Sequence, residues 1–541
     1  VFTMSVANIQ PGVPIRVLVR YVEELPYRDG QYHFHFPTTV GPRFIPGVPT
    51  GHQGTGELRD TTAVPDASRI TPATLPQGVR TPYDVDFELE LSAPMPIHGA
   101  RSGSNNLVVR AEAPRRVRAS IRNTERQPNR DIEFSYGLAT NGPAFGFLTH
   151  YTEGEGGFFS LMLEPPVTPS ARDIRPRELV FVVDTSGSMS GAPIDTARAT
   201  VRHALSHLNP NDTFQIVRFS DSASSLSPVP LRNTDENVRR GMTFIDFLTG
   251  GGGSQMTAGI HAALSPPPDP QRMRIVLFLT DGFIGHEEQI LELVDQEIGE
   301  ARLFSLGVGS SVNRYLLDRM ALRGRGDALY VNHGEPVDEV VETFYDRFEN
   351  PILTDISVNF GGMQTEDVVP RHIPDVFQGT PIRLTGRYRD GGQRRVTITG
   401  RRGGNPVSYV LPLNFPSTTQ QQPAVPLIWA RSRIEELGVL HQREPDTMRA
   451  EILPLALRHG LLTRYTSFVA IEERVTANAD DPLRTVGVPV ALPAGVSDQN
   501  VGPQVVAVGS APSLNIPQLS ACPSNSCAMG STLGMGSNYG Y

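Results

Sequence analysis

Four short, almost wholly apolar runs between residues 174 and 350 place the strongest limit on what this chain can fold into. A strand that is apolar on both faces belongs inside a sheet that is covered on both sides. Segments with helical spacing lie between the runs, so strand and helix alternate along the chain. This alternation predicts an α/β domain with a doubly wound parallel sheet over residues 174–350. The runs are LVFVV (179–183), FQIVRF (214–219), RIVLFL (274–279) and LFSLGV (303–308).

The remainder of the 541-residue chain is long enough for further domains. Residues 1–165 read as a β domain, because QYHFHFP and DVDFELELSA alternate between apolar and polar side chains. Residues 351–475 combine β signals with two helices at 428–460, and we expect a β-sandwich-like and helical region that packs back on the first β domain. Residues 476–541 are rich in Pro, Gly and Ser, which predicts a tail with little structure of its own.

Composition excludes several function classes. The net charge of −9 argues against a nucleic-acid binder, which needs a basic face. All 48 basic residues are Arg, so chemistry that depends on Lys is excluded. No stretch approaches the roughly 20 apolar residues of a membrane span. The two cysteines, Cys522 and Cys527, lack the further ligands of a zinc site, and a local disulfide and an unpaired couple both stay open.

Polar side chains follow the first apolar run at the point where the strand should end. In VFVVDTSGSMSG, Asp184 ends the strand, and Ser186 and Ser188 follow in a loop that leads into a helix. In open α/β sheets, ligands bind in the crevice at the carboxyl ends of the strands. A carboxylate with two hydroxyls is a hard-oxygen donor set, which suits Mg²⁺ and, less strictly, Ca²⁺ or Mn²⁺.

Two further segments add oxygen donors of the same kind. Asp281 ends another apolar run in LFLTDG, and Ser254 follows four glycines in GGGGSQM. Two carboxylates formally balance a divalent ion. A carboxylate held through water would leave the metal able to accept an acidic group from a protein partner. We therefore predict a metal site that consists of Asp184, Ser186, Ser188, Ser254 and Asp281.

These elements, in this order, resemble the metal-ion-dependent adhesion site of von Willebrand A domains: DxSxS, then a hydroxyl residue, then a strand-terminal TDG. That family usually has Thr where this chain has Ser254, and serine keeps the hydroxyl. The resemblance implies binding rather than catalysis at the site. No G-x-S-x-G elbow, HExxH motif or paired-cysteine redox motif is present, so we expect no enzyme.

The flanking segments resemble proteins that join a vault/inter-α-trypsin (VIT) domain to a von Willebrand A domain, such as inter-α-trypsin inhibitor heavy chains and their exported bacterial relatives. The resemblance covers roughly residues 1–475 and implies an extracellular, cell-surface or periplasmic protein. It is carried by QYHFHFP with the 30 residues before it, GPRFIPG, VPDASRITP, LTDGFIGHE, GVGSSVNRYLLDRMA, LIWARSRIEEL and LRHGLLTRYTSFVAIEE.

The resemblance also indicates that strands of the VIT domain would precede Val1. Half of such a sheet would expose a long edge, which proteins avoid. We therefore expect either that upstream residues are missing or that another chain supplies them by strand addition. The tail after Glu473 lies outside the resemblance.

Four functions are compatible with a domain of this class. The one we favour is an exported adhesion protein whose metal captures a carboxylate of a protein partner. The alternative is a structural subunit that assembles by strand addition and through its tail, with a structural metal. A partner of an ATP-driven machine is disfavoured because such partners lack VIT domains. An enzyme in which Asp184 and Asp281 activate metal-bound water is disfavoured by the resemblance.

Overall fold

The computed structural model describes residues 18–467 and 489–494, and the first range has short gaps (20, 29, 40, 42, 44, 55, 77–78, 104–105, 139–141, 167–168, 171, 283–285, 310–311, 332–335, 419–421, 442–443). The chain forms two compact units. Unit 1 comprises the described parts of residues 1–21, 31–137 and 469–541, and unit 2 those of residues 22–30 and 138–468. Val1, Cys522 and Cys527 lie outside the described residues, so the expectations about them stay open.

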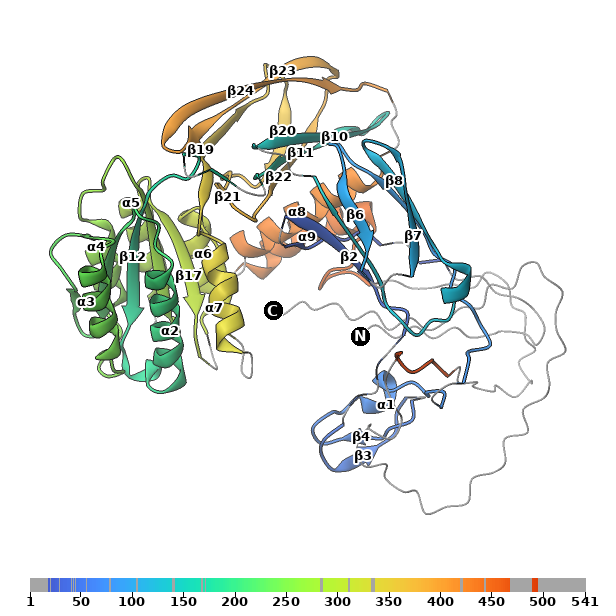
Figure 1. The fold of residues 1–541 in the computed structure, drawn as a ribbon, viewed down its shortest axis with the longest axis horizontal. Coiled ribbons are helices and arrows are strands. Elements are labelled where there is room, and N and C mark those ends of the chain that lie inside the picture. Colours follow the sequence, from blue (N-terminus) through green and yellow to red (C-terminus); the bar gives the residue numbers. More distant parts are fainter. Residues whose placement is uncertain are drawn as a thin grey trace. The chain divides into compact units, whose positions relative to one another are not determined.

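An α/β domain forms the first part of unit 2 (Figure 1). Its sheet has the order β14-β13-β12-β16-β17-β18, and β15 also pairs with β13. The four predicted apolar runs are all strands, and the pairs from β13 to β18 are parallel. The strands are β12 (Arg177–Asp184), β13 (Thr213–Phe219), β14 (Ala223–Ser225), β15 (Leu231–Arg232), β16 (Met273–Thr280), β17 (Arg302–Gly307) and β18 (Ala328–Tyr330).

The sheet is mixed and not parallel throughout, which corrects the sequence-based expectation. Strands β14 and β15 run antiparallel to β13. Only three residues separate β13 from β14, and a connection this short can join antiparallel strands but not parallel ones.

Helices cover both faces of this sheet, because alternate residues of the buried strands point to opposite sides. Phe181 of β12 packs in one hydrophobic cluster with α2, α3 and α7, whereas Val182 packs in a second cluster with α4, α5 and α6. Helix α2 lies between the first two apolar runs, in one of the segments with helical spacing. The helices are α2 (Ala192–Ser206), α3 (Asp235–Asp246), α4 (Met256–Leu264), α5 (Glu287–Glu297), α6 (Arg314–Arg323) and α7 (Val337–Asp346).

Two four-stranded sheets, β10-β11-β22-β20 and β21-β19-β23-β24, form the second part of unit 2. Their side chains share one core, in which Leu161 and Leu384 of the first sheet meet Leu353 and Ile398 of the second. The strands are β10 (Ala144–Thr152), β11 (Gly156–Glu164), β19 (Pro351–Asn359), β20 (Thr365–Val369), β21 (Val376–Phe377), β22 (Ile382–Tyr388), β23 (Gly392–Arg402) and β24 (Asn405–Phe415).

Helices α8 (Ala424–Leu440) and α9 (Pro445–His459) correspond to the two helices that we predict at 428–460, and Trp429 of α8 packs on Phe158 of β11. Strand β11 also pairs with β22 along seven residue positions. This pairing groups residues 144–164 with the part of the chain beyond 351, so the two units do not divide the chain at 165 and 351. Our sequence-based boundaries stay predictions. Unit 2 also contains the short strand β1 (Tyr27–Arg28).

Unit 1 contains small antiparallel sheets in which β2, β9 and β6 pair, β5, β8 and β7 pair, and β3 pairs with β4. Residues 489–494 belong to the predicted unstructured tail, yet the Val490 amide donates to Ala73 O and the Leu75 amide donates to Val490 O. The elements are β2 (Gln31–Phe36), β3 (Pro49–Gly51), β4 (Asp60–Thr61), α1 (Ala67–Ile70), β5 (Glu88–Ser92), β6 (His98–Ser102), β7 (Leu107–Ala113), β8 (Arg116–Ile121) and β9 (Ile132–Gly137).

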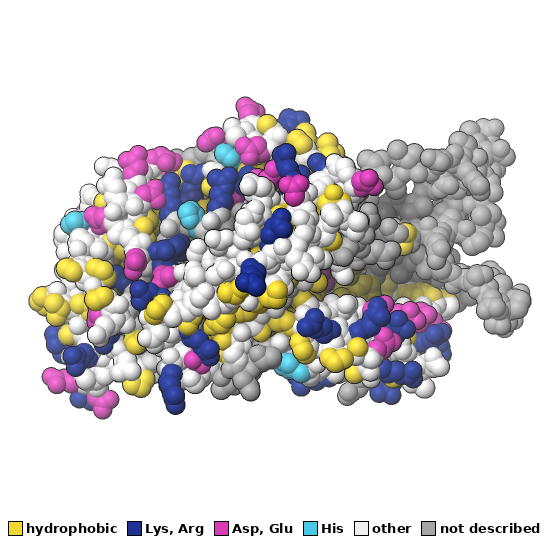
Figure 2. All heavy atoms as spheres, turned by 90° about the horizontal axis from the view of Figure 1, so that it is seen from above, with side chains coloured by type: hydrophobic (Ala, Val, Ile, Leu, Met, Phe, Trp, Pro, Cys, Tyr) yellow, Lys and Arg dark blue, Asp and Glu magenta, His cyan; other side chains and the backbone are white. Residues whose placement is uncertain are grey.

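The surface carries both signs of charge. On the face drawn in Figure 2, acidic and basic side chains lie among one another. Among the helices of the described residues, none is both long enough and apolar enough to cross a membrane.

Candidate metal centre

Two of the predicted ligands stand side by side because two strands end side by side. Asp184 is the last residue of β12, and Asp281 directly follows β16. The two strands are parallel neighbours, with Val183 opposite Leu279. Both carboxylate residues are buried, with 1% of Asp184 and 5% of Asp281 exposed. The sheet thus places two acidic side chains at the same edge.

The loop after β12 brings hydroxyls to this edge. The Ser186 amide donates to Asp184 Oδ1 at 2.8 Å, which turns the chain back over the strand end. The hydroxyls of Ser186 and Ser188 lie 3.2 Å apart, and a short 3₁₀ turn at Gly187–Met189 separates this loop from α2. Ser186 is buried and Ser188 is exposed, so the pair extends from the protein interior to solvent.

The glycine-rich segment that carries Ser254 is bonded to the same loop. The Gly251 amide donates to Thr185 O at 2.8 Å, and the Gly187 amide donates to Gly252 O at 3.0 Å. Gly252 has φ +87°, a left-handed conformation that favours glycine. Ser254 itself is half-buried. These backbone hydrogen bonds hold the segment that carries Ser254 against the loop that carries Ser186.

Sequence reasoning missed Thr280, the last residue of β16. Its hydroxyl donates to Asp184 Oδ2 at 2.6 Å and accepts from the Gly282 amide at 2.9 Å. Thr280 is fully buried, and it links the ends of the two carboxylate-bearing strands. Its position immediately before Asp281 in LFLTDG was the available signal.

Sequence reasoning also missed Asp221, which lies two residues beyond the end of β13. Its Oδ1 accepts from the Gly253 amide at 2.8 Å, next to Ser254. The available signal was an acidic residue just after the apolar run at 214–219, the same placement that identifies Asp184.

The surroundings of Asp184 disfavour the charged form of its carboxyl group. Burial raises the pKa of its carboxyl above the usual value, and the hydrogen bonds from Thr280 and Ser186 offset this only in part. The neighbouring Asp281 raises the pKa of Asp184 further, because two like charges close together disfavour ionisation. A divalent cation at this edge would reverse that disadvantage by pairing with both carboxylates.

The donor chemistry fits a hard divalent cation. The described part of the chain holds no group of three or more His, Cys, Asp or Glu side chains suited to a metal, so any ion here depends on serine hydroxyls as well as on Asp184 and Asp281. All of these donors are oxygens, which Mg²⁺, Ca²⁺ and Mn²⁺ prefer over the sulfur and nitrogen ligands of softer ions. That each of the five residues is a ligand stays a prediction.

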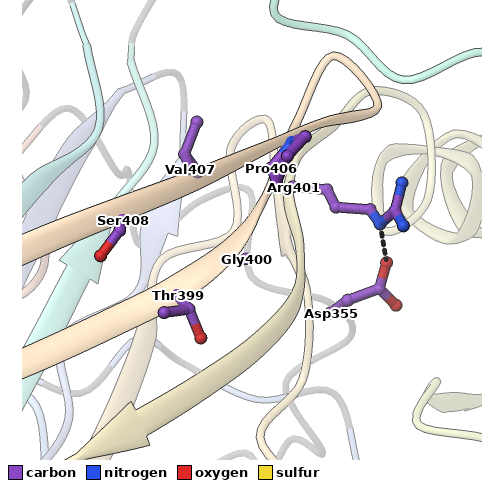
Figure 3. A pocket seen from close by; sticks show the side chains of 7 residues that line it. All are labelled: Asp355, Thr399, Gly400, Arg401, Pro406, Val407 and Ser408. Atoms are coloured by element: carbon purple, nitrogen blue, oxygen red, sulfur yellow. Dashed lines mark ion pairs between the residues drawn. The ribbon is translucent and has the colours of Figure 1, made fainter.

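A cavity of about 430 Å³ lies elsewhere in unit 2, at the β23–β24 hairpin. Arg401 and Asp355 point toward each other at its edge, with a nitrogen–oxygen distance of 3.8 Å (Figure 3). None of the five predicted metal ligands lines this cavity. Its walls are Asp355, Thr399, Gly400, Arg401, Pro406, Val407 and Ser408.

The fold and the position of this edge define a class of domain. Residues 177–329 match the family model described as the von Willebrand factor type A domain, so this part of the chain is a von Willebrand A domain. The chain is also related to inter-α-trypsin inhibitor heavy chains: it is 23% identical to heavy chain H3 of Mesocricetus auratus over 345 residues, which is 58% of this chain and 39% of that protein.

A von Willebrand factor A domain-containing protein of Dictyostelium discoideum is 26% identical over 309 residues, which is 56% of this chain and 32% of that protein. The chain therefore covers less than half the length of these curated relatives. Because the match covers only part of these relatives, it does not assign the functions of the complete proteins to this chain.

Two solved structures that resemble the chain do so at low TM-scores. A von Willebrand factor type A structure from Catenulispora acidiphila covers 59% of this chain and 88% of its own, at 15% identity and a TM-score of 0.45. A structure of proximal thread matrix protein 1 from the mussel byssus covers 35% of this chain and 50% of its own, at 14% identity and a TM-score of 0.28. That structure has zinc in its metal-ion-dependent adhesion site (MIDAS) motif. Likenesses at this level carry no argument about the site.

Proposed function

We propose that this chain is an exported adhesion protein that binds a protein partner through a divalent cation in its von Willebrand A domain. What supports the proposal is that Asp184 and Asp281 lie at the ends of adjacent parallel strands, with the hydroxyls of Ser186 and Ser188 in the loop that follows Asp184. Asp184, Ser186, Ser188, Ser254 and Asp281 would hold the ion, with Mg²⁺ as the first candidate. When bound, the ion would supply an electrophilic position for a carboxylate of the partner.

The surroundings of the site favour binding of a large partner over catalysis. Ser188 and the glycines at 187, 191 and 251–253 are exposed. Small side chains at these positions leave the edge open to a protein surface. The proposal accordingly assigns the site to recognition, and we propose that the chain is not an enzyme.

The relatives suggest where such a protein works. Inter-α-trypsin inhibitor heavy chains are among the relatives of this chain, and on that ground we propose an extracellular, cell-surface or periplasmic location. We also propose that residues 1–165 contribute a VIT-type domain of the bacterial form, as the segments quoted for this resemblance indicate.

The test is capture of a partner by the tagged full-length chain from the extracellular fraction of its own cells. Retained proteins are quantified in Mg²⁺ and in EDTA, for the wild type and for Asp184→Ala. The matched control is Asp195→Ala, which removes an exposed aspartate of α2 that pairs with Arg198. The proposal requires a partner that is lost with EDTA and with Asp184→Ala but kept with Asp195→Ala. A partner retained under all four conditions would contradict it.

A blocking variant tests whether the partner approaches over the glycine segment. Gly251 does not have a positive φ, and a Cβ built on it meets nothing within 4 Å. Gly251→Arg should therefore fold normally and keep metal binding, yet obstruct a protein that docks on this edge. Undiminished capture by Gly251→Arg would show that the partner binds elsewhere.

A second candidate function, assembly into a multimer, is favoured by the way unit 1 holds residues 489–494. A parallel bridge joins Thr74 to Val490, so the backbone of this unit pairs with the segment 489–494. The same segment of a second copy would fit there and link chains. Light scattering of the full chain over a range of concentrations tests this function. A rising mass that Ala491→Glu prevents would support assembly, and a constant monomer mass would exclude it.

A further inference from the structure

We infer that Asp221 is a positioning residue that fixes Ser254 at the metal site. The inference rests on the proposed function, because it assigns Asp221 a task in holding a metal ligand. Asp221 itself is exposed and acts through the backbone of the segment that carries Ser254.

The backbone amides on both sides of Ser254 bond to the chain that follows β13. The Gly253 amide donates to Asp221 Oδ1 at 2.8 Å. The Gln255 amide donates to Ser220 O at 2.7 Å. Two bonds that bracket one residue restrict where that residue can place its hydroxyl. The first of them requires the side chain of Asp221, whereas the second is made by backbone alone.

The anchor is firm because the end of β13 also holds the loop of Ser186. The Thr185 amide and the Thr185 hydroxyl both donate to Phe219 O, at 2.8 and 2.9 Å. Phe219 is the last residue of β13 and is fully buried. The strand end therefore sets the positions of both serine-bearing loops relative to Asp184, which lies opposite Phe219 in the sheet.

The Asp221 carboxylate lies so close to the backbone of Gly252 and Gly253 that neither position has room for a Cβ atom. A Cβ on Gly252 would lie 2.5 Å from Asp221 Oδ2, and a Cβ on Gly253 would lie 2.8 Å from Asp221 Oδ1. Both distances are shorter than van der Waals contact allows. The carboxylate thus sits directly on the glycine pair, and any larger residue there would push it away from the Gly253 amide.

The experiment compares Asp221→Ala with Asp221→Asn in the full-length chain. Alanine removes the acceptor for the Gly253 amide, whereas asparagine keeps an oxygen acceptor and removes only the charge. Hydrogen exchange of the peptide that spans residues 250–256 is followed without metal, and Mn²⁺ affinity is measured by calorimetry. Thermal unfolding checks that both variants are folded.

We expect Asp221→Ala to speed exchange in 250–256 and to weaken Mn²⁺ binding about tenfold, at the lower end of the usual effect of residues that orient metal ligands. Asp221→Asn should restore most of both properties. Unchanged exchange in Asp221→Ala, or equal losses of affinity in the two variants, would overturn the inference, since the second result assigns the effect to charge. If the wild type binds no Mn²⁺ but the exchange result holds, Asp221 orders the segment of Ser254, while the proposed function and the part of the inference that concerns the metal both fail.

Discussion

Thr280 joins the two carboxylate-bearing strands through one hydroxyl, which donates to Asp184 and accepts from the Gly282 amide. The environment around it is buried, so neither partner has water to replace the lost bond. A buried donor or acceptor left without a partner costs roughly 1–3 kcal/mol. Thr280 therefore contributes to stability and, by orienting Asp184, to the donor geometry of the site.

Thr280→Val keeps the shape of the side chain and removes the hydroxyl. We expect the free energy of unfolding to fall by about 1–3 kcal/mol and Mg²⁺ affinity to fall about tenfold. Urea denaturation and calorimetry measure the two effects. Thr196→Val is the control, because Thr196 is also buried and its hydroxyl donates to Ala192 O within α2. A Thr280→Val protein with wild-type metal affinity would show that the hydroxyl does not orient Asp184.

At the scale of elements, the apolar strands and the helices between them could be predicted because burial on both faces leaves a plain signal in the sequence. Strands β14 and β15 could not, since they are two or three residues long and partly exposed. Asp184 and Asp281 could be located because each ends an apolar run. Asp221 and Thr280 were missed, because their roles depend on hydrogen bonds between segments that are distant in sequence.

Within unit 2, an ion-pair network connects β17 of the α/β domain to the part that the two four-stranded sheets form. Arg302 is the first residue of β17 and is 1% exposed. Its guanidinium donates hydrogen bonds to the carboxylate of Asp375 and to that of Asp355. Burial would raise the pKa of Asp355, but the hydrogen bond and charge of Arg302 outweigh it, so the pKa is lowered. Because the folded pKa is depressed, this stabilisation is complete above the unfolded pKa of about 3.9 and is lost as pH falls through the folded pKa.

Arg302→Leu should lower the stability of unit 2 by about 3–5 kcal/mol at neutral pH, because it leaves Asp375 buried without its cation. The difference between variant and wild type should shrink as the pH falls, because protonation removes the charge of a buried carboxylate that has lost its cation. Denaturant unfolding at several pH values measures both effects. A loss of stability that is the same at acid and neutral pH would mean that the ion pairs are not its cause.

The segment 489–494 provides a matched pair of variants in unit 1. Ala491 is 2% exposed, whereas Ala494 is exposed. We expect Ala491→Glu to increase proteolysis within residues 31–137, because a charge at a buried position detaches the segment. Ala494→Glu should behave as the wild type. Equal resistance of the two variants would mean that the segment contributes little to unit 1.

At the scale of the whole molecule, the division into two units predicts that metal binding protects unit 2 alone from hydrogen exchange. A ligand that binds only the folded state stabilises it, by about 2.7 kcal/mol at a concentration 100 times its dissociation constant. All five predicted ligands belong to unit 2. Saturating Mg²⁺ should therefore slow hydrogen exchange around residues 184–188, 250–256 and 281–282 and leave residues 31–137 unchanged. Protection spread equally over both units would contradict this placement.

The most direct measurement is calorimetric titration of the metal-free full-length chain with Mn²⁺ and Mg²⁺, beside the double variant Asp184→Ala with Ser186→Ala and the control Asp195→Ala. Our account predicts saturable binding of one ion per chain by the wild type and by the control, and none by the double variant. Wild-type protein that binds neither ion, or a double variant that binds as the wild type does, would contradict the metal site on which the proposed function depends.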